Sequence, residues 1–241
     1  MVVPFFEVKM IYKSMQNLRV IRFAFIGEIY YFSFLRCDRI KNIDRGELRG
    51  GIMRLLFEID TKDYDENGKA FVRPSARSII IKDGKVAMVH SIKYDYYKFP
   101  GGGIEEEEDK VEALIRETLE EAGLIVIRNS IKEYGYVHRV QKSDHLDAEF
   151  FVQDNYYYLC AVEDKLEKQR LDGYEQEELF TLEFVMPEEA ICINRNENHG
   201  LKDQLMIERE ARVLECLIEE GYFWGGAIAR SLKRPKEEGL I

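Results

Sequence analysis

The sequence has few cysteines and no long apolar run. Its four cysteines, at positions 37, 160, 192 and 216, lie far apart without a CxxC pair, which is typical of reduced thiols rather than disulfides or zinc ligands. A helix that spans a bilayer needs about 18 or more consecutive apolar residues. The nearest approach, residues 20–35, is interrupted by Arg22 and Glu28. We therefore expect a cytoplasmic protein with no membrane partner.

The sequence also has no excess of positive charge. The formal net charge is −10, which argues against a nucleic-acid coat protein and against a polybasic membrane binder. Small phosphorylated substrates remain compatible with this charge, because a bound metal cation reverses the local field. With 46% apolar residues the chain can form a core, so we do not expect extensive disorder.

The first 52 residues differ from the rest in charge. They carry nine Lys/Arg and five Asp/Glu, hence +4, which leaves −14 on residues 53–241. One hypothesis is that Met53 is the natural start and that residues 1–52 are translated upstream sequence, since Arg-Gly-Gly before Met is what a purine-rich ribosome-binding site encodes. The alternative is a β-rich extension that covers the domain. We assign the main domain to residues 53–223 and a C-terminal tail to residues 224–241.

From Met53 onward the pattern predicts alternating strands and helices. Two β-rich runs in residues 76–92 flank Asp83-Gly84, a strong hairpin signal. Pro100 and the glycines that follow favour a loop. Gly123 is a suitable C-cap for a helix over residues 109–122. The expected elements are strands over 131–141, 148–163 and 179–187, and helices over 109–122, from 187, and over 200–220. This mixture predicts a mixed sheet sandwiched between helices.

Residues 101–124 concentrate nine carboxylates next to three glycines. On a helical wheel Glu117, Glu120 and Glu121 fall within an arc of roughly 100°. A separate face, made of Val111, Ile115, Thr118 and Ala122, can pack on a sheet. Like charges at these spacings repel by a few tenths of a kcal/mol. Arg116 relieves part of this repulsion, and a divalent cation relieves more. Clustered carboxylates suit Mg²⁺, which shares its ligand shell with substrate phosphates.

The glycines Gly101, Gly102 and Gly103 add a second requirement. Without side chains they let the backbone approach a ligand, and a glycine loop before a helix can present N–H groups to an anion. A metal seat together with an anion site indicates phosphate chemistry. Lys98 directly precedes the loop and is the favoured phosphate contact. The other candidates are Arg73 and Arg77, and simple solvated charge is the alternative for all three.

This stretch resembles the signature of the Nudix hydrolases, G-x5-E-x7-R-E-U-x-E-E-x-G-U, in which U is a bulky aliphatic residue. The positions that match are Gly102, Glu108, Arg116, Glu117, Glu120, Glu121, Gly123 and Leu124. Two positions depart from the pattern: Thr118 stands where an aliphatic residue is usual, and Glu107 replaces a glycine common in the loop.

The resemblance implies a Nudix-type α/β/α sandwich with a mixed β-sheet and hydrolysis of a nucleoside diphosphate linked to another moiety. It assigns the metal, Mg²⁺ with Mn²⁺ as the alternative, to Glu117, Glu120 and Glu121, with Glu108 acting directly or through Arg116. Arg116, Glu117 and Glu120 are then catalytic. Some members of the family take the general base from a later loop, which makes Glu178 the candidate and Glu175 and Glu177 its rivals.

The substrate is not defined by the sequence. His138 stands where members that cleave ADP-ribose carry a proline, and the marks of several other subfamilies are missing. We expect a small nucleotide-type substrate, no nucleic-acid partner, and either a monomer or a homodimer. The alternative function is a non-catalytic Nudix module that binds a nucleotide or regulates a partner, although such a module has no need to keep all the acidic residues of the motif.

Overall fold

The computed structural model describes residues 22–25, 28–31, 53–196 and 198–223. The chain divides into two compact units, residues 1–51 and 52–241, which we describe separately. In the first unit, β1 (Arg22–Phe25) and β2 (Glu28–Tyr31) pair antiparallel. Two predictions concern residues that lie largely outside the described ranges. These are the start at Met53 and the C-terminal tail over residues 224–241, and both remain predictions.

The second unit contains twelve strands and four α-helices among its described residues. The strands are β3 (Leu55–Asp60), β4 (Ala70–Val72), β5 (Ser75–Ile79), β6 (Ile81–Lys82), β7 (Lys85–Ser91), β8 (Tyr96–Lys98), β9 (Gly101–Gly103), β10 (Leu124–Val126), β11 (Lys132–Lys142), β12 (Phe150–Leu159), β13 (Val162–Leu166) and β14 (Phe180–Val185). The helices are α1 (Lys110–Ala122), α2 (Gly173–Glu177), α3 (Pro187–Asn194) and α4 (Gln204–Glu219). Within the described ranges no helix has both the length and the apolar character needed to cross a bilayer.

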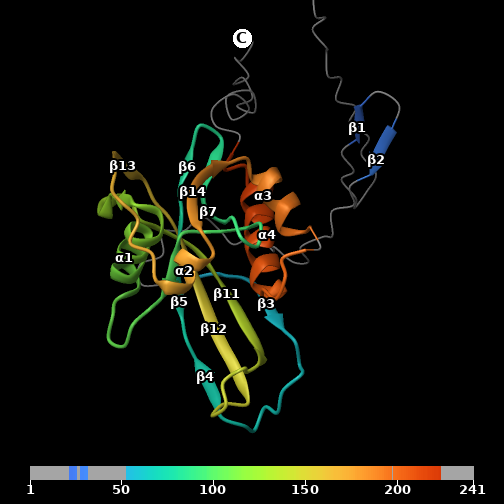
Figure 1. The fold of residues 1–241 in the computed structure, drawn as a ribbon, viewed down its shortest axis with the longest axis vertical. Helices are drawn as coiled ribbons and strands as arrows, with labels where there is room; N and C mark the ends of the chain where they lie inside the picture. The colour runs from blue at the N-terminus through green and yellow to red at the C-terminus, as the bar shows by residue number, and fades with distance from the viewer. Residues whose placement is uncertain (1–21, 26–27, 32–52, 197, 224–241) are drawn as a thin grey trace, which may run out of the picture. The chain divides into compact units, whose positions relative to one another are not determined.

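The larger sheet is mixed and the second is antiparallel, and helices lie on both sides of them. One sheet has the order β3-β11-β12-β5-β9, with β4 also on β12, and a second has the order β14-β7-β6, with β8 also on β7. The pairs β3–β11, β4–β12 and β5–β12 are parallel, whereas β11–β12 and β5–β9 are antiparallel. Helix α1 lies on one side, and α3 and α4 lie on the other (Figure 1). The α/β/α sandwich expected from the sequence is therefore confirmed.

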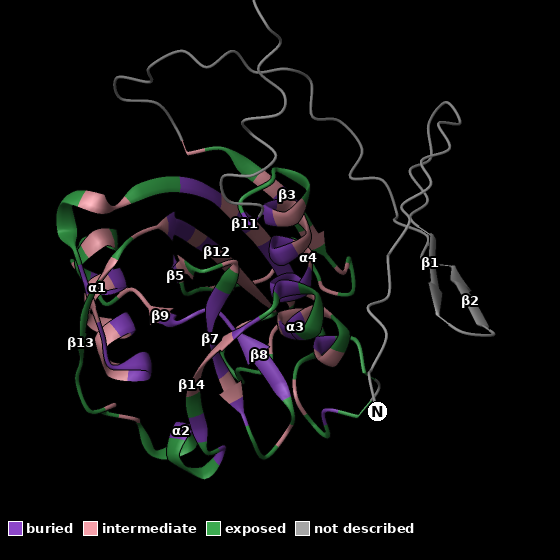
Figure 2. Cartoon of the chain, turned by 90° about the horizontal axis from the view of Figure 1, so that it is seen from above, coloured by how far each residue is buried: buried purple, intermediate pink, exposed green. Residues whose placement is uncertain are grey.

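The helix faces that turn toward the sheets are apolar. On the α4 side, Val213 and Leu214 pack with Ile79, Val137 and Tyr157 in one fully buried cluster. A smaller cluster, Ala76, Ala113, Leu114 and Tyr158, joins α1 to the sheet. Figure 2 shows the buried residues gathered on the inner faces of these elements. The two clusters fix α1 and α4 on opposite faces of β5 and β12 because successive strand residues point to opposite sides.

The glycine segment differs from its prediction. A loop was expected at residues 101–103, but Gly101–Gly103 forms β9 and pairs with Arg77, Ala76 and Ser75 of β5. Tertiary pairing overrides the low strand propensity of glycine here. The expected hairpin at Asp83-Gly84 is confirmed for β6 and β7, whereas the first part of the upstream run joins the other sheet as β5.

A buried ionic group lies between α4 and the sheet. The side chains of Arg209 and Glu210 are both 0% exposed and form an ion pair. Arg209 Nη1 also donates to Asn155 Oδ1 at 2.6 Å, and Glu210 is 3.7 Å from Arg77 Nε. Burial of charge is costly unless each group has a partner, and removal of one partner leaves the other charge uncompensated.

We therefore expect Arg209→Met to lower the free energy of unfolding by about 3–5 kcal/mol. The matched control is Arg195→Met, because Arg195 is also an ion-paired arginine, bonded to Glu208 and Glu215, but is 40% exposed. The control should lose less than about 1 kcal/mol. Chemical denaturation of both variants measures the difference, and equal losses would contradict the importance of burial.

Candidate active site

Helix α1 carries the acidic motif, and its ends have defined caps. Asp109 accepts a hydrogen bond from Val111 N at 2.8 Å, and Gly123, with φ 66°, donates its N–H to Leu119 O at 2.9 Å. Such caps satisfy backbone groups that lack partners inside the helix. Glu117 and Glu120 are only partly buried, as the helical wheel predicts. Glu121, which the wheel places in the same patch, is buried instead.

Arg116 is the centre of a network of charged side chains in the site. Its Nε and Nη2 each donate to Glu108 at 2.8 Å, one to each carboxylate oxygen. Its Nη1 contacts Glu117 at 2.6 Å and Glu120 at 3.3 Å, and Nη2 also reaches Gly103 O at 3.1 Å. The hydrogen bonds from Arg116 lower the pKa of Glu108. Arg116 thus joins the loop, the glycine strand and two motif carboxylates.

Glu117 lies directly against the glycine strand. A Cβ added to Gly102 would stand 2.3 Å from Glu117 Oε2, so the absence of a side chain at Gly102 makes room for the carboxylate. Burial raises the pKa of Glu117 even though Arg116 opposes the shift. An ionised Glu117 would therefore be stabilised by additional positive charge.

Glu121 is the most enclosed of the motif carboxylates, at 1% exposure. It accepts a hydrogen bond from Gly101 N at 3.0 Å and pairs with Lys98 Nζ. Burial raises its pKa to about 7, with Lys98 acting in the opposite direction. Lys98, expected from the sequence to contact phosphate, is itself 6% exposed and held at Glu121. A contact between Lys98 and substrate stays a prediction.

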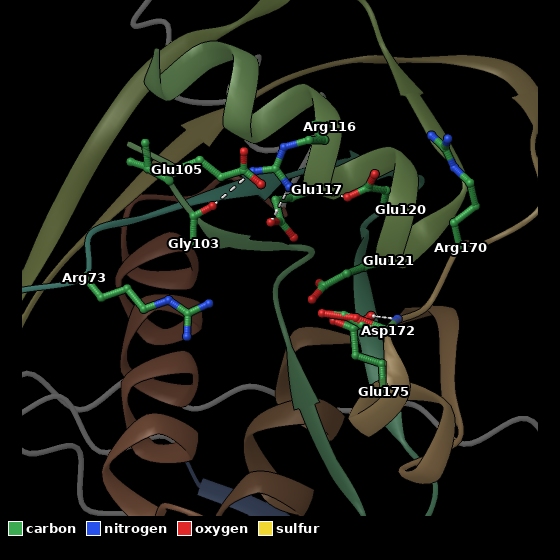
Figure 3. A pocket seen from close by; sticks show the side chains of 11 residues that line it. Arg73, Gly103, Glu105, Arg116, Glu117, Glu120, Glu121, Arg170, Asp172 and Glu175 are labelled. Atoms are coloured by element: carbon green, nitrogen blue, oxygen red, sulfur yellow. Dashed lines mark hydrogen bonds and ion pairs between the residues drawn. The ribbon is translucent and has the colours of Figure 1, made fainter. Parts of the chain in front are cut away.

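Three motif carboxylates, those of Glu117, Glu120 and Glu121, line one cavity of about 500 Å³, whereas Glu108 does not line it. Residues from four other segments complete its wall (Figure 3). The cavity is lined by Arg73, Gly103, Ile104, Glu105, Arg116, Glu117, Glu120, Glu121, Arg170, Asp172 and Glu175. Arg73 and Arg170 stand on opposite sides of the carboxylates (Figure 3) and have no ion pair with any residue described. A cavity with an acidic centre flanked by two guanidinium groups can hold a metal cation together with an anionic ligand.

The loop before α2 reaches the cavity because it is bonded to the end of α1. Arg170 N donates to Glu120 O at 2.8 Å, and Glu167 N donates to Gly123 O at 2.9 Å. These bonds satisfy carbonyl groups in the last turn of α1, which the helix itself cannot pair. Sequence reasoning missed Arg170 and Asp172, because no motif or periodicity marks the loop that carries them.

The three candidates for the general base occupy different positions. Glu175 lines the cavity, is 4% exposed and accepts a hydrogen bond from Asp172 N at 2.9 Å. Glu178 is not among the cavity residues: it accepts from Ser91 Oγ at 3.1 Å and Tyr96 Oη at 2.9 Å and also pairs with Lys202. Glu177 is exposed.

The two departures from the motif have local explanations. Thr118 is fully buried, and its hydroxyl donates to Leu114 O at 2.6 Å, so it packs as a small residue without an unpaired polar group. Glu107 has φ 65°, a left-handed conformation that costs a side chain about 1–2 kcal/mol and costs glycine little. The left-handed backbone conformation thus explains why glycine is common at this position of the motif.

The donor chemistry of the cavity fits a hard divalent cation. Six residues with carboxylates line one space, namely Glu105, Glu117, Glu120, Glu121, Asp172 and Glu175, and oxygen donors are the ligands that Mg²⁺ prefers. Within the described part of the chain, no three acidic, histidine or cysteine side chains are grouped closely enough to enclose a metal ion. Glu117 and Glu120 instead pair with Arg116, and Glu121 pairs with Lys98, so cation binding requires these three carboxylates to exchange partners.

Comparison with known proteins gives the class of the molecule. The sequence model of the NUDIX domain matches residues 72–207, more than half of the chain. The chain therefore belongs to the NUDIX domain family, whose enzymes hydrolyse phosphoanhydride bonds. Comparison with curated protein sequences found no match.

Several solved structures are similar to this chain. A MutT structure from work on Aliivibrio salmonicida and Vibrio cholerae has 16% identity and a TM-score of 0.41, covering 62% of this chain and 99% of its own. The Bacillus subtilis pyrophosphohydrolase BsRppH, as a mutant, has 23% identity and a TM-score of 0.40, with 68% and 90% covered. A NUDIX hydrolase from Nitrosomonas europaea has 18% identity and a TM-score of 0.39, with 53% and 82% covered.

The left-handed backbone at Glu107 yields a stability prediction. We expect Glu107→Gly to stabilise the protein by about 0.5–1 kcal/mol, because relief of strain exceeds the entropic cost of a new glycine. Glu106→Gly is the control: Glu106 is also exposed but is not among the described residues with positive φ, so this variant should lose stability. Denaturant titration compares the two, and a loss for Glu107→Gly similar to that of the control would refute the explanation.

The glycine strand yields a paired prediction. A Cβ at Gly101, where φ is 142°, would stand 2.2 Å from Ala76 O, whereas one at Gly102 would meet the carboxylate end of the Glu117 side chain and no backbone atom. We expect Gly101→Ala to cost about 2–4 kcal/mol of stability and Gly102→Ala less than about 1 kcal/mol. Thermal and chemical unfolding distinguish the two variants. Equal losses of stability would mean that the close contact between Gly101 and the backbone of β5 does not restrict which residues β9 can accept.

Proposed function

We propose that this protein is a metal-dependent hydrolase that cleaves the pyrophosphate bond of a nucleoside diphosphate linked to another moiety. The observation that carries the proposal is the cavity lined by Glu117, Glu120 and Glu121 together with Arg73 and Arg170, two arginines that pair with no carboxylate in the part of the chain that the structure describes. Acidic groups alone would repel a pyrophosphate. Carboxylates that hold a cation, together with arginines, can instead bind an anion, because the cation and the arginines both compensate its negative charge.

Glu117, Glu120 and Glu121 are the proposed ligands of Mg²⁺, with Mn²⁺ as the alternative, and Glu108 acts through Arg116. A bound divalent ion would neutralise charge on the pyrophosphate and lower the pKa of the attacking water. Arg116 has the further task of orienting Glu117 and Glu120, since one of its nitrogens contacts both. Arg73 and Arg170 would hold phosphate oxygens from the two sides of the cavity. The backbone of Gly102 leaves the space that Glu117 occupies.

For the proton acceptor we favour Glu175 over Glu178. Both carboxylates already accept hydrogen bonds, Glu175 from Asp172 N and Tyr174 Oη and Glu178 from Ser91 and Tyr96. Only Glu175, however, lines the cavity. A general base must reach the proton that it removes, directly or through one water. Glu178 instead anchors the end of α2 and so keeps Glu175 at the cavity. Glu178 as the base is the alternative.

The variant Glu120→Gln tests the proposed metal seat. Because a neutral amide is a poor ligand for Mg²⁺, we expect it to lose at least about 100-fold in turnover, which corresponds to roughly 2.7 kcal/mol, while its unfolding curve is unchanged. Glu112→Gln is the matched control, because Glu112 lies on the same helix but is exposed and pairs with Arg128. Phosphate release from a panel of nucleotide substrates with Mg²⁺ is the measurement.

Equal turnover in wild type and Glu120→Gln would refute the assignment of the metal ligands. Loss of turnover in Glu112→Gln to the same degree would show that general acidity of α1, rather than the cavity, supports the reaction. No turnover by wild type on any member of the panel would favour the alternative, a Nudix module that binds without catalysis.

A further inference from the structure

The β11–β12 hairpin and the neighbouring segment around β4 carry a surface of which only Arg73 has a role in the proposed reaction. Phe151 of β12 pairs with Phe71 of β4 on one side and with Gln141 of β11 on the other. Directly paired strand residues share a face, as do residues two apart. Gln153 therefore lies on the same face as Phe151. We call the set Phe71, Arg73, Gln141, Phe151 and Gln153 the hairpin surface.

The aromatic part of the hairpin surface is a stacked pair. The rings of Phe71 and Phe151 have centroids 5.8 Å apart and an interplanar angle of 29°, and both residues are only half-buried. Neither ring belongs to the buried clusters that hold the helices on the sheets. His145, which is exposed, lies with its ring centroid 4.0 Å from that of Phe71. Partly exposed rings of this kind provide stacking surfaces for planar ligands.

The polar part consists of two amides of fixed orientation. Gln141 Oε1 accepts from Arg139 Nε at 2.9 Å, and Gln153 Oε1 accepts from Arg209 Nη1 at 3.1 Å. Arg139 and Arg209 are 2% and 0% exposed. Because a guanidinium only donates, each arginine must face the carbonyl end of its glutamine. The two Nε2 groups are thereby left as donors, and neither has an acceptor among the residues described.

Arg73 connects the hairpin surface to the cavity. Its backbone N–H donates to Val152 O at 3.0 Å, which places Arg73 two residues beyond Phe71 and alongside Gln153. Its guanidinium lies over Gly103, with Nε 3.0 Å from the position of a Cβ there, and it lines the cavity. Two residues of extended chain span roughly 7 Å, a separation that a ribose can bridge between a phosphate on Arg73 and a base on the rings.

We propose that the hairpin surface binds the nucleobase of the substrate, stacked on Phe71 and Phe151, and that it selects bases with carbonyl acceptors, such as guanine and uracil, over adenine. The selection follows from the two amide donors, since guanine presents acceptors where adenine presents an amino group. This inference deepens the proposed function and rests on it for the position of the phosphates. It gives the substrate class as guanine or uracil nucleotides.

Binding of imidotriphosphate analogues to the full chain, measured by calorimetry with Mg²⁺, tests this inference. Wild type should bind the guanosine analogue at least about 5-fold more tightly than the adenosine analogue, because an adenine amino group would face the two amide donors. Phe151→Leu should weaken guanosine binding by about 5- to 100-fold, because stacking is lost. Phe150→Leu is the matched control: Phe150 is the adjacent residue on the same strand, is also half-buried, and stacks on Tyr64 on the other face. It should change binding by less than about 2-fold.

Two further variants keep the test decisive. Phe71→Leu removes the same platform from β4 and should reproduce the loss if Phe151→Leu does not fold. Gln141→Glu removes one of the two donors while keeping an acceptor for Arg139, so it should reduce the preference for guanosine without weakening adenosine binding. Circular dichroism verifies that each variant is folded before binding is measured.

The outcomes separate this inference from the proposed function. Equal effects of Phe151→Leu and Phe150→Leu, or equal affinity for both analogues, would overturn the inference. Turnover of nucleotides with no base preference would leave the hydrolase intact and the hairpin surface unused. Base-selective binding without turnover of any corresponding hydrolysable nucleotide would support the hairpin surface and refute the enzyme.

Discussion

The contact between the glycine strand and α1 is the constraint on which the site depends. β9 pairs with β5 on one side and accepts the carboxylates of α1 on the other. Gly101 donates its N–H to Glu121, and Gly102 leaves the space that Glu117 fills. A side chain at either position would collide with protein atoms. The motif glycines and the motif glutamates are therefore two halves of one packing arrangement.

The same strand is held from the α4 side by buried charge. Arg77 Nη1 donates to Phe99 O at 3.2 Å and to Gly101 O at 3.3 Å, and Glu210 of α4 compensates the charge of Arg77. Both carbonyl groups belong to the segment that carries Lys98 and Gly101 to Glu121. Helix α4 thus contributes to the geometry of the carboxylates although it carries none of them. Buried ion pairs need not add stability, but here they define where the strand lies.

Much of the fold and the centre of the site were predictable from the sequence, because both depend on short-range patterns. Helix α1, its cap at Gly123 and the face shared by Glu117 and Glu120 follow from spacing along one helix. The strand at Gly101–Gly103 was not predictable, because it forms through pairing with β5 against the propensity of glycine. The places of Arg170 and Glu175 depend on backbone bonds to the last turn of α1, and no local pattern encodes such bonds.

The most direct test of the account is Mn²⁺ binding to Gly102→Ala, followed by the loss of the free-ion paramagnetic resonance signal. Gly102 offers no side chain to a metal, yet a methyl group there would displace the carboxylate of Glu117 from its position. The account predicts that the folded variant binds Mn²⁺ at least about 10-fold more weakly than wild type, a difference of about 1.4 kcal/mol. Equal affinity in the two proteins would contradict the claim that the glycine strand sets the geometry of the metal ligands.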